Sequence, residues 1–207
     1  MKKTKKILAI ILLLISIISF VAGYITLKNK DKKKPVEEVK TVDNIKTKEF
    51  DYVLYDNKSD LYKDYFGKLK DELTKEEINE EEYAKLVSEL FVIDFYSLID
   101  KKTNTDIGGL DFIYESMKEN FVLKASDTIY KYVESNVYGD RMQTLPKVTE
   151  VSTTSIIKKN VTIKDLQDPN GYVATISIKY DKDLKYPTST TITLVHKDKK
   201  LYIVEVK

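Results

Sequence analysis

The chain has 207 residues, enough for one ordinary domain and an appendage but not for two full domains beside a membrane segment. Hydrophobic residues make up 42% of the sequence and include 15 Tyr and 7 Phe, so a packed core is expected and global disorder is excluded. There is no Cys, which excludes disulfides, thiolate zinc sites and Cys nucleophiles.

The net charge of +2 is unevenly distributed. Residues 1–49 contain 12 Lys and 5 acidic residues, a balance of +7, whereas residues 50–207 contain 23 basic and 28 acidic residues, a balance of −5. A mildly acidic folded part lacks the basic surface that contacts with a phosphate backbone require, so we expect no nucleic acid partner. Only Arg141 among the 35 basic residues is an arginine, which is typical of an AT-rich bacterial genome.

An uncharged apolar segment, residues 7–27, follows a short basic tail, residues 1–6. As a helix rising about 1.5 Å per residue it spans roughly the 30 Å of a bilayer's hydrocarbon core. The apolar region of a secretory signal peptide is shorter, about 7–15 residues, and the best cleavage motif, Val21-Ala22-Gly23, lies inside this segment. We therefore predict an uncleaved transmembrane helix in contact with membrane lipid. Cleavage near Gly23, which would release a secreted domain, is the alternative.

Residues 28–49 are rich in Lys and Glu, contain no aromatic residue and are interrupted by Pro35, which predicts a solvated linker. Lysines flank the apolar segment on both sides, so counting charges does not settle its orientation. The very short N-terminal tail and the lack of Cys both favour a domain held outside the cytoplasm at the cell membrane. A cytoplasmic domain is the alternative.

Two long helices are predicted after the linker. Residues 59–73 carry apolar side chains at three- and four-residue steps, which predicts an amphipathic helix. A second helix is expected from about Glu80, because Asn79 and Glu82 have the spacing of a capping box. Apolar residues occupy more than one face of this second helix, which predicts that it is the central helix of the core.

Two shorter helices are predicted next. Gly108-Gly109 has the composition of a turn into a helix, with apolar positions at Leu110, Ile113, Tyr114, Met117 and Phe121. A phosphate loop is not expected there, because no strand precedes the glycines and no Lys-Ser/Thr follows them. The last predicted helix covers residues 126–136, with Ile129, Val133 and either Tyr130 or Tyr132 facing inward.

After Gly139 the apolar period falls to two and β-branched residues dominate, which predicts strands. We place a turn at residues 168–171 and the last hairpin turn at residues 197–200. The strands are expected at residues 148–157, 172–180, 190–196 and 201–206. Helices followed by a strand meander predict an α+β domain, residues 50–207, in which the helices pack on a curved antiparallel four-stranded sheet.

One membrane helix, three or four further helices and four long antiparallel strands ending at the C-terminus resemble the VirB8-like proteins of type IV secretion and conjugation machines. The resemblance covers residues 50–207 as an order of elements and rests on no residue motif. It implies the cone-shaped NTF2-like fold and a scaffold subunit that docks other envelope proteins and self-associates as a homo-oligomer. NTF2-like folds also include enzymes and small-ligand binders, so the fold does not choose a function.

Few residues offer catalytic or metal-binding chemistry. His196 is the single His, and we expect its imidazole at a strand end facing solvent rather than in a nucleophilic triad. Glu80-Glu81-Glu82 is expected to stabilise a helix N-terminus through the helix dipole rather than to bind a metal. We therefore expect no cofactor and no metal.

Asp94 falls within the apolar stripe of the predicted core helix, so its carboxylate must be paired or have a raised pKa. One interpretation is a structural ion pair or a hydrogen bond to a Tyr hydroxyl. The other is a general base in a pocket beside Tyr96, Tyr114 or Tyr130. Arg141 is the candidate charge partner.

Two functions follow from these observations. The first is a single-pass envelope protein, not an enzyme, whose outer domain binds other envelope proteins, as a scaffold in secretion or conjugation. The second is a small-ligand binder or enzyme with a pocket around Asp94 between helices and sheet. The many tyrosines suit a protein-binding surface and core packing equally well.

Overall fold

The computed structural model describes residues 39–47, 49–163 and 166–207, which belong to one folded unit, Val39–Lys207. Within these residues, no helix combines the length and the hydropathy needed to cross a membrane. The basic tail and the predicted transmembrane helix, residues 7–27, lie outside the described residues, as do residues 28–38 of the predicted linker.

The folded unit begins earlier than predicted. Strands β1, Thr41–Lys46, and β2, Asp51–Tyr55, form an antiparallel hairpin, so the prediction of a linker was wrong for residues 41–46. The strand escaped prediction because Ile45 is its one buried side chain, and the alternation of apolar and polar residues that marks a strand is missing. An ion pair of 2.7 Å between the Lys70 ammonium and the Asp43 carboxylate ties the hairpin to the next helix.

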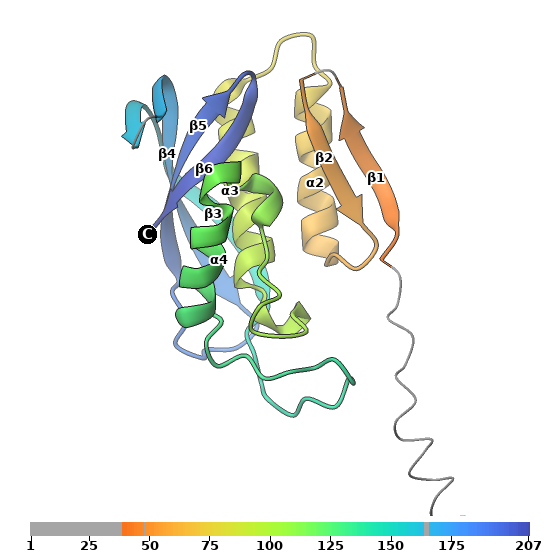
Figure 1. Cartoon of the computed structure of the whole chain (residues 1–207). Coiled ribbons are helices and arrows are strands. Elements are labelled where there is room, and N and C mark those ends of the chain that lie inside the picture. The colour runs from red at the N-terminus through yellow and green to blue at the C-terminus, as the bar shows by residue number, and fades with distance from the viewer. Residues whose placement is uncertain (1–38, 48, 164–165) are drawn as a thin grey trace, which may run out of the picture. The chain divides into compact units, whose positions relative to one another are not determined.

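Helices α2, Asp60–Leu73, and α3, Glu80–Tyr96, confirm the prediction of two long helices. The Ser59 side chain caps α2, and the Asn79 side chain caps α3 by accepting hydrogen bonds from two backbone N–H groups of its first turn. Helix α3 is buried around its circumference, because α2 packs on one side and the large sheet on the other (Figure 1). It is the central core helix that the sequence predicts.

The single helix predicted after Gly109 is replaced by two short 3-10 helices, Leu110–Phe112 and Glu115–Met117, followed by α4, Lys118–Asp127. The prediction was wrong because the chain is extended at Ile113, which forms a β-bridge with Ile203 of the last strand. Tertiary pairing with the sheet thus interrupts a segment whose apolar spacing is helical.

The helix predicted over residues 126–136 is also absent from this part of the structure, where α4 ends at Asp127 and turns and extended backbone follow. Tyr130 and Val133 are buried, as predicted, while Tyr132 is exposed. The Tyr130 hydroxyl donates to the Phe95 carbonyl at 2.6 Å and accepts from a backbone N–H, and these bonds draw the chain out of a helical path.

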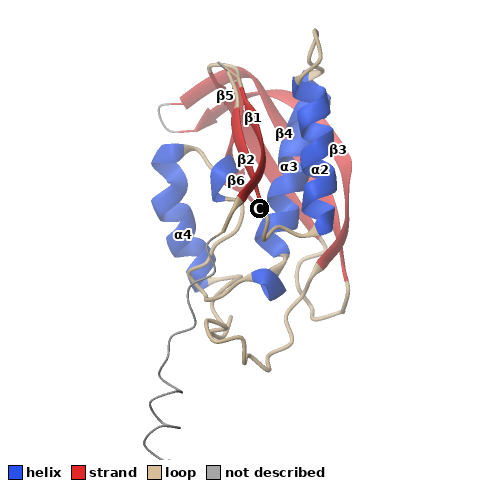
Figure 2. Ribbon diagram, turned by 90° about the vertical axis from the view of Figure 1, so that its right-hand side faces the viewer, coloured by secondary structure: helices blue, strands red, loops and turns tan. Residues whose placement is uncertain are grey.

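The second half of the domain is a four-stranded antiparallel meander in the order β3-β4-β5-β6 (Figures 1 and 2). It confirms the predicted α+β class, with helices packed on one antiparallel sheet. The four strands are β3, Val148–Ile163; β4, Leu166–Tyr180; β5, Ser189–Lys197; and β6, Lys200–Val206. The last hairpin turn lies between Lys197 and Lys200, as predicted.

The turn predicted at residues 168–171 is wrong, because these residues lie inside β4. Asp168 and Gly171 pair with β3 on the two sides of a register shift between Lys159 and Val161. Gly171 is required there for space, since a Cβ atom would lie 2.6 Å from Val161 Cγ2. The Asp168 carboxylate accepts from the backbone N–H of Asn170 at 2.8 Å, the local bond of an Asx turn. These turn-forming residues therefore form a β-bulge within β4 instead of a turn between two strands.

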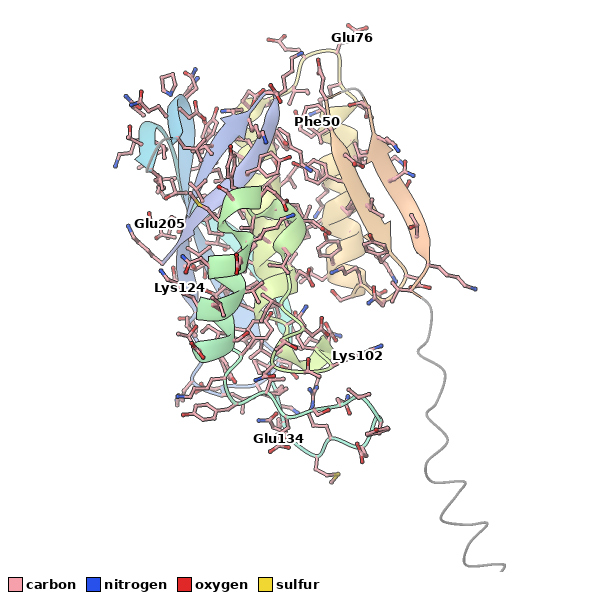
Figure 3. The ribbon with its side chains drawn as sticks, in the orientation of Figure 1. Phe50, Glu76, Lys102, Lys124, Glu134 and Glu205 are labelled. Atoms are coloured by element: carbon pink, nitrogen blue, oxygen red, sulfur yellow. The ribbon has the colours of Figure 1, made fainter. Side chains whose placement is uncertain are left out.

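The two ends of the domain carry different loops. The loop between α2 and α3, which contains Glu76, lies at one end, and Lys102 and Glu134 lie toward the other (Figure 3). Between the ends, the core is formed by the inner face of the sheet, α3, the buried face of α2 and the β1–β2 hairpin.

Candidate functional site

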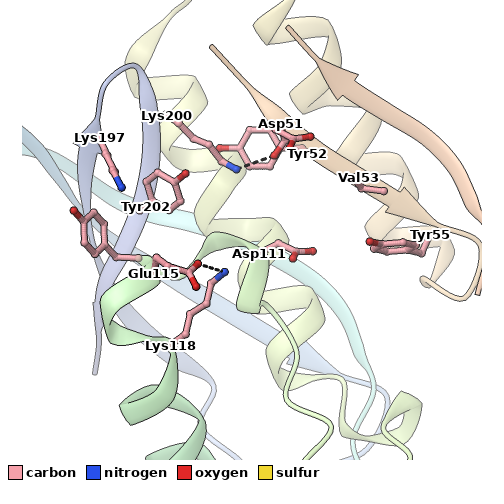
Figure 4. A pocket seen from close by; sticks show the side chains of 11 residues that line it. Asp51, Tyr52, Val53, Tyr55, Asp111, Glu115, Lys118, Lys197, Lys200 and Tyr202 are labelled. Atoms are coloured by element: carbon pink, nitrogen blue, oxygen red, sulfur yellow. Dashed lines mark hydrogen bonds and ion pairs between the residues drawn. The ribbon is translucent and has the colours of Figure 1, made fainter. Parts of the chain in front are cut away.

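A surface pocket of about 240 Å³ lies where β2, the segment that leads into α4 and the β5–β6 hairpin meet (Figure 4). We call it the Tyr–Lys pocket because four tyrosines and three lysines line it, together with acidic side chains at its rim. The tyrosines and lysines are Tyr52, Tyr55, Tyr114, Tyr202, Lys118, Lys197 and Lys200.

The strand period explains how β6 supplies two of these side chains. Leu201 and Ile203 are fully buried in the core, so the alternate positions, Lys200 and Tyr202, lie on the opposite face and line the pocket. The β5–β6 turn also places Lys197, the last residue of β5, directly opposite Lys200 in the ladder. A short polar hairpin thus delivers two lysines and a tyrosine to one wall.

Lys200 forms the centre of the pocket. Its ammonium donates to the Asp51 carbonyl at 2.7 Å and lies 4.2 Å from the centre of the Tyr52 ring and 5.1 Å from that of Tyr202. Burial disfavours the charged form and lowers the pKa of Lys200 below its ordinary value. Within the described residues no carboxylate forms an ion pair with it, although the Asp51 and Asp111 carboxylates lie near enough to favour its charged form. Its direct contacts are the aromatic faces and the Asp51 carbonyl.

The rim combines aromatic and charged groups. The rings of Tyr114 and Tyr202 pack edge to face with centres 5.7 Å apart, and the Lys197 ammonium lies 5.5 Å from the centre of the Tyr114 ring. Lys118 is paired with Glu115 at 2.7 Å. Lys118 is thus neutralised by its neighbour. Among the lysines of the pocket, Lys197 and Lys200 have no ion-pair partner within the described residues, although the Asp51 and Asp111 carboxylates also line the pocket.

This arrangement suits a carboxylate that carries some apolar surface. An ammonium has three N–H donors, and Lys200 uses one of them on the Asp51 carbonyl. The volume lies just below the range of about 300–1,000 Å³ that is usual for small-molecule sites, so a single side chain of a partner protein fits better than a cofactor. Tyr is enriched in protein-binding surfaces for its rigid, amphipathic ring.

Asp94 is held in an ion-pair network. Its carboxylate oxygens lie 2.7 Å from the Lys58 ammonium and 2.8 Å from that of Lys101, and it also accepts from the Gly109 backbone N–H at 2.8 Å. Burial would raise the pKa of Asp94, but the two ammonium groups outweigh it and hold that pKa below its ordinary value. The recess beside Asp94 measures about 60 Å³, a quarter of the Tyr–Lys pocket.

The other candidate residues are not gathered around Asp94. Arg141 is not its partner, because the guanidinium donates to the carbonyls of Ile99, Lys101 and Glu134. Tyr96 lies two residues after Asp94 in α3, where the two side chains do not share a face. Its ring packs edge to face on that of Phe95, with centres 4.9 Å apart.

Two predicted tyrosines serve other parts of the domain. Tyr130 is buried and bonds to the backbone near Asp94 but not to its carboxylate. Tyr114 lies in the Tyr–Lys pocket.

His196 differs from its predicted solvent-facing position. Its side chain is 20% exposed, with Nδ1 2.8 Å from the Asp168 carboxylate and Nε2 3.2 Å from the Glu80 carboxylate. Glu80 therefore joins the start of α3 to the sheet in addition to standing near the capped helix end. Over the described ranges, no cluster of three or more His, Asp or Glu side chains is placed to hold a metal ion.

Tyr52 is one of the tyrosines that the sequence offers for a protein-binding surface, but Lys200 and Tyr202 were not predicted as site residues, and Lys200 was expected only within a hairpin turn. The available signal was the alternation over residues 200–203, which predicts that Lys200 and Tyr202 share a face. The contribution of Tyr52 could not be predicted, because β2 reaches this wall through tertiary packing alone.

Comparison with known proteins gives no further assignment. No protein family, no curated protein and no solved structure matches the chain, so its function has to be argued from the geometry of the site.

Proposed function

We propose that the chain is a single-pass membrane protein of a bacterial envelope whose folded domain is held outside the cytoplasm and binds other envelope proteins as a scaffold. The observation that carries the binding function is the Lys200 ammonium, held between Tyr52 and Tyr202 in an open pocket without a carboxylate partner among the described residues. The pocket takes an acidic side chain of the partner protein, and the tyrosine rings pack on its apolar part.

We also propose a fold family for the domain. Two long helices precede four antiparallel strands that run to the C-terminus, and this order supports an NTF2-like domain of the VirB8-like kind. Three register shifts in the β3–β4 pair support the curvature that such a sheet needs, because each bulge bends the strand that carries it. In this proposal the domain also self-associates, as the resemblance implies.

Site-specific crosslinking in growing cells tests the binding function. With benzoylphenylalanine in place of Tyr202 we expect a discrete adduct with an envelope protein, and with the same probe in place of Ile157, an exposed residue of β3, we expect none. Lys200→Met abolishes the adduct, whereas Lys179→Met, which removes an exposed lysine of β4, leaves it intact. An adduct unchanged by Lys200→Met contradicts the proposal.

The topology is tested separately. Since the chain has no Cys, Glu76→Cys creates a unique label site in the exposed loop between α2 and α3. We expect a membrane-impermeant maleimide to label this variant in intact cells, and the full-length product to stay in the membrane fraction after an alkaline wash. Labelling only after lysis contradicts an outer domain, and release by the wash contradicts an anchor.

A further inference from the structure

The segment that joins α4 to β3, residues 128–147, exposes large apolar side chains. We call it the apolar end loop. Met142 is 93% exposed, Tyr132 75%, Tyr138 64% and Val137 56%. Single exposed apolar residues are ordinary, but four within eleven positions of one loop form a concentrated feature that needs an explanation.

The loop is held in shape by a polar frame. Arg141 binds three carbonyls, and the Gln143 side chain accepts from the Glu134 backbone N–H at 2.9 Å and donates to the Tyr132 carbonyl at 2.7 Å. The backbone N–H of Asn136 donates to the Lys102 carbonyl at 2.7 Å. The exposed side chains therefore project from an ordered scaffold, which lowers the entropy cost of using them in binding.

The apolar end loop lies toward the end of the domain where the folded unit begins. The Lys40 carbonyl accepts from the Asp56 backbone N–H at 2.9 Å, and two residues later Lys58 shares the Asp94 carboxylate with Lys101. The Lys101 carbonyl in turn accepts from Arg141 of the loop. Both ribbon views place the start of β1 and this loop toward the same end (Figures 1 and 2).

The length of chain before the domain limits how far the domain can move from a membrane. Residues 28–38 separate the proposed transmembrane helix from Val39, and fully extended they span at most about 40 Å. With the anchor of the proposed function in the bilayer, this length limits how far Val39 can lie from the bilayer surface.

We propose that the apolar end loop docks on the lipid surface of the membrane that holds the anchor, with Tyr132 and Tyr138 at the headgroup level and Met142 in the outer acyl region. This inference rests on the anchor described under the proposed function. Tyr prefers the membrane interface, because its ring is apolar and its hydroxyl is wet. The loop has three basic and two acidic residues, so anionic headgroups do not repel it.

Fluorescence of the full-length protein tests the docking. The chain has no Trp, so Tyr138→Trp introduces a single Trp, whose emission is distinct from that of the tyrosines. The protein is reconstituted in vesicles of phosphatidylcholine and phosphatidylglycerol, with or without bromine on the acyl chains. We expect brominated lipid to quench Tyr138→Trp strongly. The matched variant Glu76→Trp, at the other end of the domain (Figure 3), keeps its emission.

The outcomes separate the two proposals. Flotation of the protein with the vesicles, together with selective quenching of Tyr138→Trp, supports both the anchor and the docking. Flotation with equally weak quenching of the two variants by brominated lipid overturns the docking alone. The apolar end loop would then be a candidate surface for a protein partner. Failure to float overturns the anchor and the docking together. Met142→Asp in the Tyr138→Trp background is expected to reduce the quenching, since it places a charge in the acyl region.

Discussion

At the level of single residues, the pKa values of two acids of α3, Asp94 and Glu89, are shifted in opposite directions. Asp94 is paired with two ammonium groups, so its charged form is favoured. Glu89 is buried and accepts hydrogen bonds from the backbone N–H and the hydroxyl of Thr153, yet burial still raises its pKa above the ordinary value. The two carboxylates therefore shift the stability of the domain in opposite directions as the pH changes.

Removal of the Asp94 charge tests the ion-pair network. We expect Asp94→Asn to lower the free energy of unfolding of residues 39–207 by about 3 kcal/mol, because the buried Lys101 ammonium and the partly buried Lys58 ammonium lose their partner. Asp64→Asn removes the exposed carboxylate paired with Lys68 and is expected to cost about 0.5 kcal/mol or less. Denaturant unfolding at neutral pH measures both. Equal losses in the two variants would show that the Asp94 network stabilises the domain no more than an exposed ion pair does.

The pH dependence of the free energy of unfolding, measured for wild type and Asp94→Asn, gives a second test. The folded pKa of Asp94 is depressed, so its contribution is complete above the ordinary pKa of 3.8 and is lost as the pH falls through the folded value. The difference in stability between wild type and Asp94→Asn should therefore shrink as the pH is lowered below about 4. A difference that stays constant in acid contradicts the assignment.

Glu89→Gln is expected to stabilise the domain at neutral pH, whereas Asp94→Asn destabilises it. Because the folded pKa of Glu89 is raised, the charged carboxylate opposes folding as the pH rises above its ordinary value of 4.5. Gln keeps an oxygen that accepts from Thr153, so we expect the variant to melt at a higher temperature than wild type at pH 7. The advantage should vanish below pH 4, where both side chains are neutral. Thermal unfolding at the two pH values decides this.

At the scale of elements, close packing determines where the chain turns after α3. A Cβ atom on Gly108 would lie 2.3 Å from the Asp94 carbonyl oxygen, and Gly109 has a φ of +75° beside the Phe91 ring. The glycine pair thus lets the chain pass against α3 and place a backbone N–H on the Asp94 carboxylate. The glycines therefore allow close packing against α3, and Gly109 also caps the short 3-10 helix Leu110–Phe112, as the predicted turn into a helix requires.

Alanine substitutions separate this role from ordinary glycine flexibility. Gly108→Ala is expected to lower the free energy of unfolding by about 2 kcal/mol, because the backbone of α3 cannot give way. Gly67→Ala, within α2 with open space around its Cβ position, is expected to raise it by roughly 0.5–1 kcal/mol. Chemical denaturation compares the two variants. A stable Gly108→Ala protein would contradict the close approach.

At the scale of the whole molecule, the β1–β2 hairpin completes the core. Phe50, Tyr52 and Leu54 are buried, and the Tyr52 hydroxyl lies 2.6 Å from that of Tyr83 in α3. The hairpin also supplies the β2 wall of the Tyr–Lys pocket. A domain that began at residue 50, as the sequence suggested, would lose β1 and leave β2 unpaired.

Truncation tests this boundary. We expect residues 39–207 to fold as a stable unit, whereas residues 50–207 should melt at a lower temperature and self-associate through the bare edge of β2. Circular dichroism measures the melting temperature and size-exclusion chromatography the association. Equal melting temperatures and monomeric elution for both proteins would show that β1 does not stabilise the domain.

Features with local signals could be predicted from the sequence. Apolar periodicity and side-chain caps located α2 and α3, and alternation located the four strands of the meander and therefore the α+β class. The apolar run at residues 7–27 determined the prediction of a membrane anchor in the same way. Each of these signals depends on neighbours within a few positions along the chain.

Tertiary structure alone decided the rest. Ile113 leaves a helical pattern because it bridges to Ile203, and the turn-forming residues from Asp168 become a bulge because the chain pairs with β3. Asp94 forms ion pairs with Lys58 and Lys101 rather than with Arg141, and the Lys200 ammonium lies over the ring of Tyr52 from another sheet. These partners lie far apart in the sequence or on different elements, and such contacts carry no periodic signal, so packing rather than local propensity selects them.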